Sequence, residues 1–343
     1  MQAVPGTFVS YDNVDAARFS GTGVTTVNLN GVSPSLKTLA LSGASAYTLA
    51  QGTGAASLQF KSDSGNARVT AGSNGHLISA PVVLASNLTA TVTYSGDTLT
   101  FSNTLSGSAY GLTKDGAGTL VLSGANNYGG LTAVANGTLL VNGANSGSAA
   151  LSVAAGATLG GIGSITGAVI VDGILAPGTS IGALGSGNLT FNDNSTFSYG
   201  MDSSAALPAE LADLQSVDGN LVLAKVAGNV VHLILTDLAA VPAAFAPDTT
   251  LTLVRYAGAW NNGYFTYGSN ELVDGEQFTA GLNTWTIHYG ADTAGMNFAS
   301  VPVGGSFINL SNSLTSIPEP GSLLALGCLI GSGALLRTRR RKP

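Results

Sequence analysis

The chain has 343 residues, of which only 9% are charged, and its formal net charge at neutral pH is −6. Seven of its 12 Lys and Arg residues precede residue 318, against 17 of its 18 acidic residues, so residues 1–317 carry a net charge of −10. Seven scattered basic side chains are too few for a surface that follows a phosphate backbone, which argues against nucleic acid as a partner. The single cysteine, Cys328, excludes an intrachain disulfide.

The composition favours β-structure throughout the chain. Glycine contributes 47 residues, about twice its average share, while Val, Thr and Leu are abundant and Glu, Lys, Met and Gln are scarce. An apolar content of 45% is normal for a folded protein rather than a disordered one. We therefore predict an all-β protein that is stabilised by burial and backbone hydrogen bonds alone.

The N-terminal segment does not show an export signal. Residues 1–30 contain neither a basic start nor an apolar run, so no signal peptide is visible. Because the C-terminus described below predicts export, we hypothesise that the true N-terminus of the protein lies upstream.

Residues 107–223 contain a loose repeat of the form Gly-polar-apolar-x-apolar, which is typical of short strands between turns. Its first two intervals, Gly118 to Gly137 and Gly137 to Gly156, are both 19 residues long. This spacing is close to one coil of a β-solenoid and favours parallel stacking of equivalent strands. We predict a right-handed parallel β-helix over residues 1–240, with a β-sandwich as the alternative. The repeat units start at Gly118, Gly137, Gly156, Gly167, Gly187 and Gly219.

Residues 241–303 are aromatic and differ from the repeats. Short alternating stretches there predict antiparallel strands that cap the open end of the solenoid, because an uncapped end would expose unpaired backbone groups. The alternative is a platform on which sugar rings stack. Residues 304–317 are polar and are predicted to be a linker. The aromatic residues are Tyr256, Trp260, Tyr264, Phe265, Tyr267, Phe278, Trp285, Tyr289 and Phe298.

The acidic residues of the predicted solenoid are dispersed. A polysaccharide lyase or hydrolase needs clustered carboxylates for acid–base chemistry or calcium binding. Single acids with few neighbouring arginines are interpreted here as solvated turn residues, so we expect no catalytic site. These dispersed acids are Asp97, Asp115, Asp172, Asp193, Asp202, Asp213 and Asp218.

Two further sequence patterns resemble parts of catalytic or metal-binding sites. Residues 178–182 (GTSIG) match the nucleophile elbow of α/β-hydrolases, but that motif requires a following helix, and a solenoid turn is expected here. The histidines His76, His232 and His288 stand alone without the spacing of metal ligands, so we predict structural roles and no metal or cofactor.

The C-terminal residues 318–343 combine three elements in a fixed order. The triplet Pro318-Glu319-Pro320 precedes a 16-residue apolar run, residues 321–336, which would span about 24 Å as a helix. A basic cluster follows, which would lie on the cytoplasmic side of a membrane. The segment from Leu323 to Leu336 is therefore predicted to be a short transmembrane helix. The cluster consists of Arg337, Arg339, Arg340, Arg341 and Lys342.

This tail resembles the PEP-CTERM sorting signal of exported bacterial proteins. The resemblance implies recognition of Pro318, Glu319 and Pro320 by an exosortase-type membrane transpeptidase, release of the tail, and a cell-surface or extracellular destination. An ordinary anchor helix is the alternative, and it also places the body of the protein outside the cytoplasm.

The repeats resemble a second family. Residues 111–143 (GLTKDGAGTLVLSGANNYGGLTAVANGTLLVNG) and 151–191 look like the autotransporter-associated β-strand repeat of passenger domains. That resemblance implies an exported β-helical stalk, and family resemblance suggests association with exopolysaccharide and biofilm matrix. The sequence thus predicts a non-enzymatic surface or matrix protein. The alternative is a carbohydrate-binding or polysaccharide-degrading protein on the same scaffold.

Overall fold

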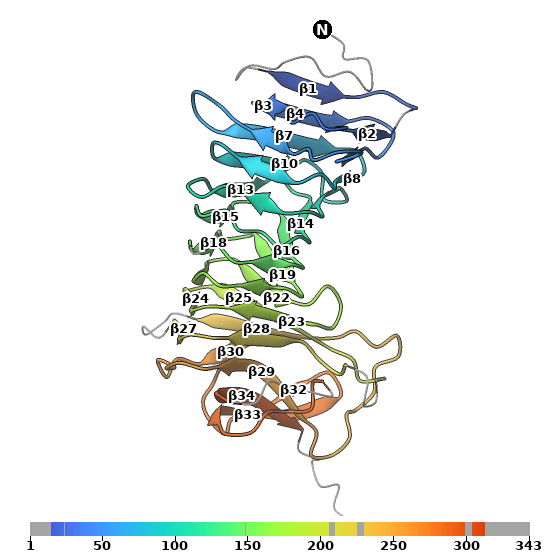
Figure 1. Ribbon diagram of the computed structural model, residues 1–343. Helices are drawn as coiled ribbons and strands as arrows, with labels where there is room; N and C mark the ends of the chain where they lie inside the picture. Colours follow the sequence, from blue (N-terminus) through green and yellow to red (C-terminus); the bar gives the residue numbers. More distant parts are fainter. Residues whose placement is uncertain are drawn as a thin grey trace, which may run out of the picture.

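The computed structural model describes residues 15–23, 25–147, 149–205, 210–224, 230–298 and 304–312. Within these ranges every regular element is a strand, and the strands stack along one long axis (Figure 1). Most turns of the chain add one strand to each face of the stack, and the strands of successive turns pair in parallel. This arrangement confirms the predicted all-β parallel solenoid, and the parallel pairing contradicts the β-sandwich alternative.

The first and second sheets run along most of the axis and form two of its faces. The first sheet contains β1 (Ala16–Phe19), β4 (Thr38–Ser42), β7 (Ala67–Gly72), β10 (Leu88–Val92), β13 (Leu112–Asp115), β15 (Thr132–Val134), β18 (Leu151–Val153), β21 (Val169–Val171), β24 (Leu189–Phe191) and β27 (Leu221–Leu223). The second sheet contains β2 (Thr26–Asn28), β5 (Thr48–Ala50), β8 (Gly75–Ile78), β11 (Thr98–Phe101), β14 (Thr119–Leu122), β16 (Thr138–Val141), β19 (Thr158–Gly161), β22 (Ile174–Pro177), β25 (Ser195–Met201), β28 (Val231–Asp237), β30 (Phe265–Tyr267) and β31 (Asn270–Leu272).

Two shorter sheets complete the remaining side, one after the other along the chain. The third sheet contains β3 (Ser35–Leu36), β6 (Leu58–Phe60), β9 (Val82–Leu84) and β12 (Leu105–Ser106). The fourth sheet contains β17 (Ala144–Asn145), β20 (Ser164–Ile165), β23 (Ala183–Ser186), β26 (Leu214–Val217), β29 (Thr250–Tyr256), β32 (Gln277–Ala280), β33 (Asn283–Ala291) and β34 (Ser306–Asn312).

The core is a stack of apolar side chains from alternate strand positions. In the second sheet Leu120 pairs with Leu139, Leu139 with Leu159, and Leu159 with Leu175. All four side chains are at most 1% exposed. Burying one leucine side chain contributes about 1.5–3 kcal/mol, so each coil is stabilised mainly by the coil on either side of it.

The repeat units predicted from the sequence are all strands, but they do not form one column. The units at Gly118, Gly137 and Gly156 lead into β14, β16 and β19 of the second sheet. The units at Gly167, Gly187 and Gly219 lead into β21, β24 and β27 of the first sheet. The same sequence pattern therefore precedes strands of two different sheets, because a coil contains more than one Gly-bounded strand.

The C-terminal end of the solenoid changes from parallel to antiparallel pairing. Strand β29 pairs in parallel with β26 but antiparallel with β34, and β34, β33 and β32 continue antiparallel. Strands β30 and β31 form a second antiparallel pair at the end of the second sheet. These strands lie at the opposite end of the molecule from β1 (Figure 1).

The linker predicted for residues 304–317 is wrong for its first part. Residues 306–312 form β34 between β29 and β33, and the side chains of Phe307, Ile308 and Leu310 are at most 2% exposed. Asn309 and Asn312, two of the polar residues that suggested a linker, are also buried. Their side chains donate hydrogen bonds to the carbonyl oxygens of Thr293 and Phe245, respectively, which compensates for their loss of contact with water. The antiparallel end of the molecule thus extends to residue 312.

A polar network fastens the antiparallel end to the last coils. The buried Asn297 side chain donates to the hydroxyl of Tyr199 and to the backbone oxygens of Asp213 and Thr252, and its Oδ1 accepts from the Thr252 amide. Tyr199 lies on β25 and Asp213 just before β26, whereas Thr252 lies on β29. One amide side chain therefore joins three separate segments of the chain.

Candidate functional site

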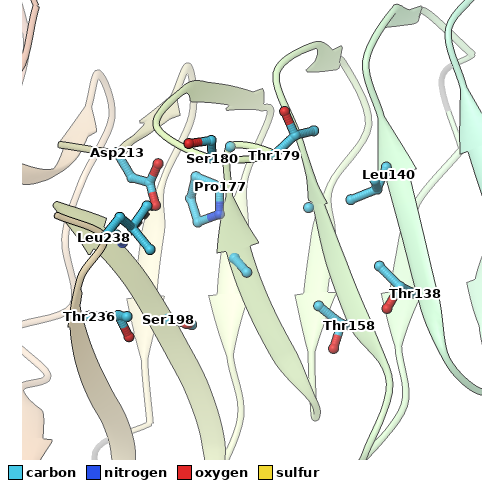
Figure 2. A pocket seen from close by; sticks show the side chains of 14 residues that line it. Thr138, Leu140, Thr158, Pro177, Thr179, Ser180, Ser198, Asp213, Thr236 and Leu238 are labelled. Carbon is cyan, nitrogen blue, oxygen red and sulfur yellow. Dashed lines mark hydrogen bonds between the residues drawn. The ribbon is translucent and has the colours of Figure 1, made fainter. Parts of the chain in front are cut away.

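A shallow trough lies on the outer face of the second sheet, across β16, β19, β22, β25 and β28 (Figure 2). Its volume is about 370 Å³. Side-chain hydroxyls, small residues, two leucines and one carboxylate line it. The lining residues are Thr138, Leu140, Thr158, Gly160, Ala176, Pro177, Gly178, Thr179, Ser180, Ser198, Gly200, Asp213, Thr236 and Leu238.

The trough exists because outward-facing side chains shrink over consecutive coils. Leu140 pairs with Gly160, and Gly160 pairs with Ala176 in the next coil. On the following strands Ser198 pairs with Ile234. The loss of side-chain volume between Leu140 and Ile234 leaves the sheet face hollow, without any opening into the core.

Asp213 closes one side of the trough. Its Oδ1 accepts a hydrogen bond from the Gly182 amide at 2.9 Å, and its Oδ2 accepts one from the Gly200 amide at 2.7 Å. Burial raises the pKa of this carboxyl from 3.8 to about 7, although the two hydrogen bonds favour the charged form. Glycine is required at position 178, since a Cβ at Gly178, whose φ is +86°, would lie 2.6 Å from Oδ1 of Asp213.

The environment of Asp213 corrects the interpretation of the acids as solvated turn residues. Asp213 is 3% exposed and Asp97 is 8% exposed. The Asp97 carboxylate accepts from the amides of Ser73 and Asn74 at 2.7 and 3.0 Å, and both of those residues have a positive φ. These two carboxylates hold turns together, whereas Asp115, Asp172 and Asp193 accept from asparagine side chains near the surface.

The GTSIG segment lies in the trough but does not form a nucleophile elbow. It joins strands β22 and β23, and no helix follows it in the described residues. Ser180 and Asp213 both line the trough, but no histidine does. Within the lining there is one carboxylate and no second acid or base, so the arrangement offers hydrogen-bonding groups to a polar ligand rather than an acid–base pair.

The three histidines each have structural partners. His76 is buried, its Nδ1 accepting from the Tyr47 amide at 3.0 Å and its Nε2 lying 3.2 Å from the Gly72 oxygen. His232 Nδ1 lies 3.4 Å from Thr266 Oγ1, and His288 Nε2 lies 3.1 Å from Ser311 Oγ. Among the described residues, no group of three or more His, Cys, Asp or Glu side chains could hold a metal ion.

The aromatic residues of the C-terminal end pack on one another. Trp260 stacks on Tyr289 with ring centroids 5.0 Å apart, and Tyr264 meets Tyr289 edge-on at 5.1 Å. The Tyr289 hydroxyl accepts from the Phe265 amide, which fixes the ring, and Trp285 is completely buried. Trp260 and Tyr289 therefore each cover one face of the other's ring.

The burial of Lys114 was not predicted from the sequence. Lys114 on β13 is fully buried, and its Nζ donates to the backbone oxygens of Asp115, Gly116 and Asn136 at 2.9, 2.7 and 2.9 Å. Burial lowers the pKa of this ammonium from 10.5 to about 8, with the Asp115 charge opposing the shift. The side chain thus joins the turns of two successive coils from inside. Its signal in the sequence was a basic residue at an inward position of the alternating stretch Leu112–Asp115.

The predicted sorting residues Pro318, Glu319 and Pro320 and the basic cluster from Arg337 to Lys342 lie outside the described residues, as does the predicted transmembrane helix. In the part of the chain that the structure describes, no helix is long and apolar enough to cross a membrane.

Comparison with known protein families matches residues 112–141 to the passenger-associated transport repeat. The match begins at β13 and ends at β16, and it includes Lys114 and the first 19-residue interval. No curated protein matches the chain. The matched repeat is associated with autotransporter passengers, which suggests an exported, surface-type protein.

Proposed function

We propose that this protein is an exported, non-enzymatic structural component of the cell surface or extracellular matrix. The observation that carries the proposal is the passenger-associated repeat at residues 112–141, which is embedded in a longer parallel solenoid rather than standing alone.

The surface of the solenoid supports a structural role. The outward positions of the second sheet are mainly small or hydroxylated, as at Thr138, Thr158, Ala176 and Ser198. The first sheet has ten strands, and at about 4.8 Å between strands its stack is roughly 43 Å long. Such a stalk would hold other groups away from the envelope and present few flexible segments to proteases.

The proposed route to the surface uses the C-terminal tail. Pro318, Glu319 and Pro320 would be recognised by an exosortase-type membrane transpeptidase, while the apolar run up to Leu336 and the basic cluster hold the substrate in the bilayer in one orientation. An exopolysaccharide or another matrix polymer is the proposed partner of the released body.

The sorting proposal is tested by intact mass and cell fractionation in the native host. Wild type is compared with the variant Pro318→Ala/Glu319→Ala/Pro320→Ala, and with Ser313→Ala/Ser316→Ala as a matched control just before the triplet. We expect the wild type and the control to lose about 20 C-terminal residues and to leave the cell, with the triplet variant remaining full length in the membrane. Full-length, membrane-bound protein in all three strains would refute processing and leave a plain anchor.

A further inference from the structure

The two ends of the solenoid carry different backbone edges. At the N-terminal end β1, β2 and β3 are each the first strand of a sheet, and no described strand pairs with their outer edges. At the other end, β31 and β32 are the last strands of the second and fourth sheets. Figure 1 shows β1 and β32 at opposite ends of the long axis.

Basic residues gather at the N-terminal end. Arg18 lies on β1 and is exposed, and Lys37 directly follows β3. In residues 15–70 the described chain has four basic residues, Arg18, Lys37, Lys61 and Arg68, against two acids, Asp15 and Asp63.

Acidic residues gather at the C-terminal end. Glu271 lies on β31, and Asp274 and Glu276 lie between β31 and β32, all three exposed to solvent. With Asp292 they give four acids and no Lys or Arg among the described residues from 265 to 298.

The charges at both ends have no ion-pair partner within the described chain. The ion pair among the described residues joins Arg255 to Asp218 at 3.1 Å, and it lies at neither end strand of a sheet. Unpaired charges of opposite sign at opposite ends attract a second copy over about 10 Å at 0.1 M salt.

We infer that copies of this chain associate head to tail, the basic edge of β1–β3 in one copy docking on the acidic end formed by β31 and β32 in the next. Strand edges that pair with no described strand supply backbone donors and acceptors at this contact, and the charges select its direction. A head-to-tail contact between unlike surfaces does not close on itself unless its rotation happens to form a ring, so it extends into filaments. This inference adds a partner to the proposed structural role but does not depend on export.

The experiment is sedimentation velocity on the full chain in a mild nonionic detergent, which keeps the apolar run equivalent in all samples. Two variants reverse one end each: Arg18→Glu/Lys37→Glu and Glu271→Lys/Glu276→Lys/Asp292→Lys. The first carries two acidic ends and the second two basic ends. Asp172→Lys is the matched control, a charge reversal at an exposed residue between β21 and β22, away from both ends.

Wild type and control should form oligomers that grow with concentration at 50 mM NaCl and dissociate at 500 mM. Each end variant alone should lose at least tenfold in association constant, and an equimolar mixture of the two should recover it. Circular dichroism verifies that each variant is folded, and recovery in the mixture excludes misfolding as the cause.

Three results would overturn the inference. Wild-type chain that stays monomeric at 50 mM NaCl is one. A second is oligomers whose association changes neither with salt nor with charge reversal at either end, because such oligomers would be held together by the apolar run. Association that is seen only after deletion of residues 2–14 would show that the chain's own N-terminal segment covers the edge.

Discussion

The carboxyl of Asp213 makes the stability of the last coils depend on pH. Its pKa is about 7 in the folded chain and 3.8 in the unfolded reference, so the folded state binds the extra proton between these values. A raised folded pKa means that the contribution is fully present below pH 3.8 and is lost as the pH rises through 7. At about 1.4 kcal/mol per pKa unit, the loss is about 4 kcal/mol between pH 4 and 8.

The assay is urea unfolding followed by circular dichroism, for wild type and Asp213→Asn, at pH 4.5, 6 and 8. The asparagine cannot ionise, and its amide nitrogen opposes one of the amides of Gly182 and Gly200, so we expect it to cost about 1–3 kcal/mol at pH 4.5. Because other groups titrate equally in both proteins, the informative quantity is the difference between the two pH profiles. The variant should overtake the wild type, or equal it, by pH 8. Parallel profiles across this range would refute the raised pKa of Asp213.

Two further predictions concern buried polar groups. Lys114→Met should destabilise the chain by about 3–5 kcal/mol at pH 7, measured by urea unfolding, because three backbone oxygens lose their donor; Lys61→Met, on a partly exposed side chain, serves as the control. The wild type should in addition gain stability between pH 8 and 10.5, since the unfolded chain binds the lysine proton more tightly there, and a flat profile in that range would contradict the buried ammonium. Asn297→Ala should cost about 3 kcal/mol or more and open the C-terminal end first, because it removes four hydrogen bonds between three segments. Limited proteolysis checks this, with initial cleavage in residues 241–298 expected, and an unchanged digestion pattern would contradict the role of the network.

The solenoid was predictable because the first Gly-bounded units recur every 19 residues, which is close to the length of one coil. The spacing breaks down further along, where Thr158 pairs with Ile174 and Ile174 with Thr196. Coil lengths change there because turns take up insertions while the inward positions keep their register. Sequence periodicity alone cannot follow such changes, which explains why units of two sheets were read as one series.

The buried polar groups were less predictable than the strands. Asp213 lies just before β26 and outside any strand, so its burial depends on contacts with Gly182 and Gly200, which are distant in sequence. The segment of β34 was predicted to be a polar linker because it contains Asn309 and Asn312. Their side chains form hydrogen bonds with partners at least 16 residues away in sequence, which the local pattern does not show. Hydropathy measures the side chain but not its partner, so it places paired polar residues on the surface. The trough was not predicted for a related reason. It results from the small side chains that neighbour one another across three coils, and their proximity depends on the register between coils.

The network around Asn297 also has a consequence for the order in which the molecule can fold. Coils pair with segments about 20 residues away, so each can form soon after the preceding one during synthesis. Asn297 meets Tyr199 across 98 positions of sequence, and β34 must reach back to β29. The antiparallel end is therefore the slow, non-local step, and until residue 312 is available the fourth sheet lacks the strand that joins β33 to β29.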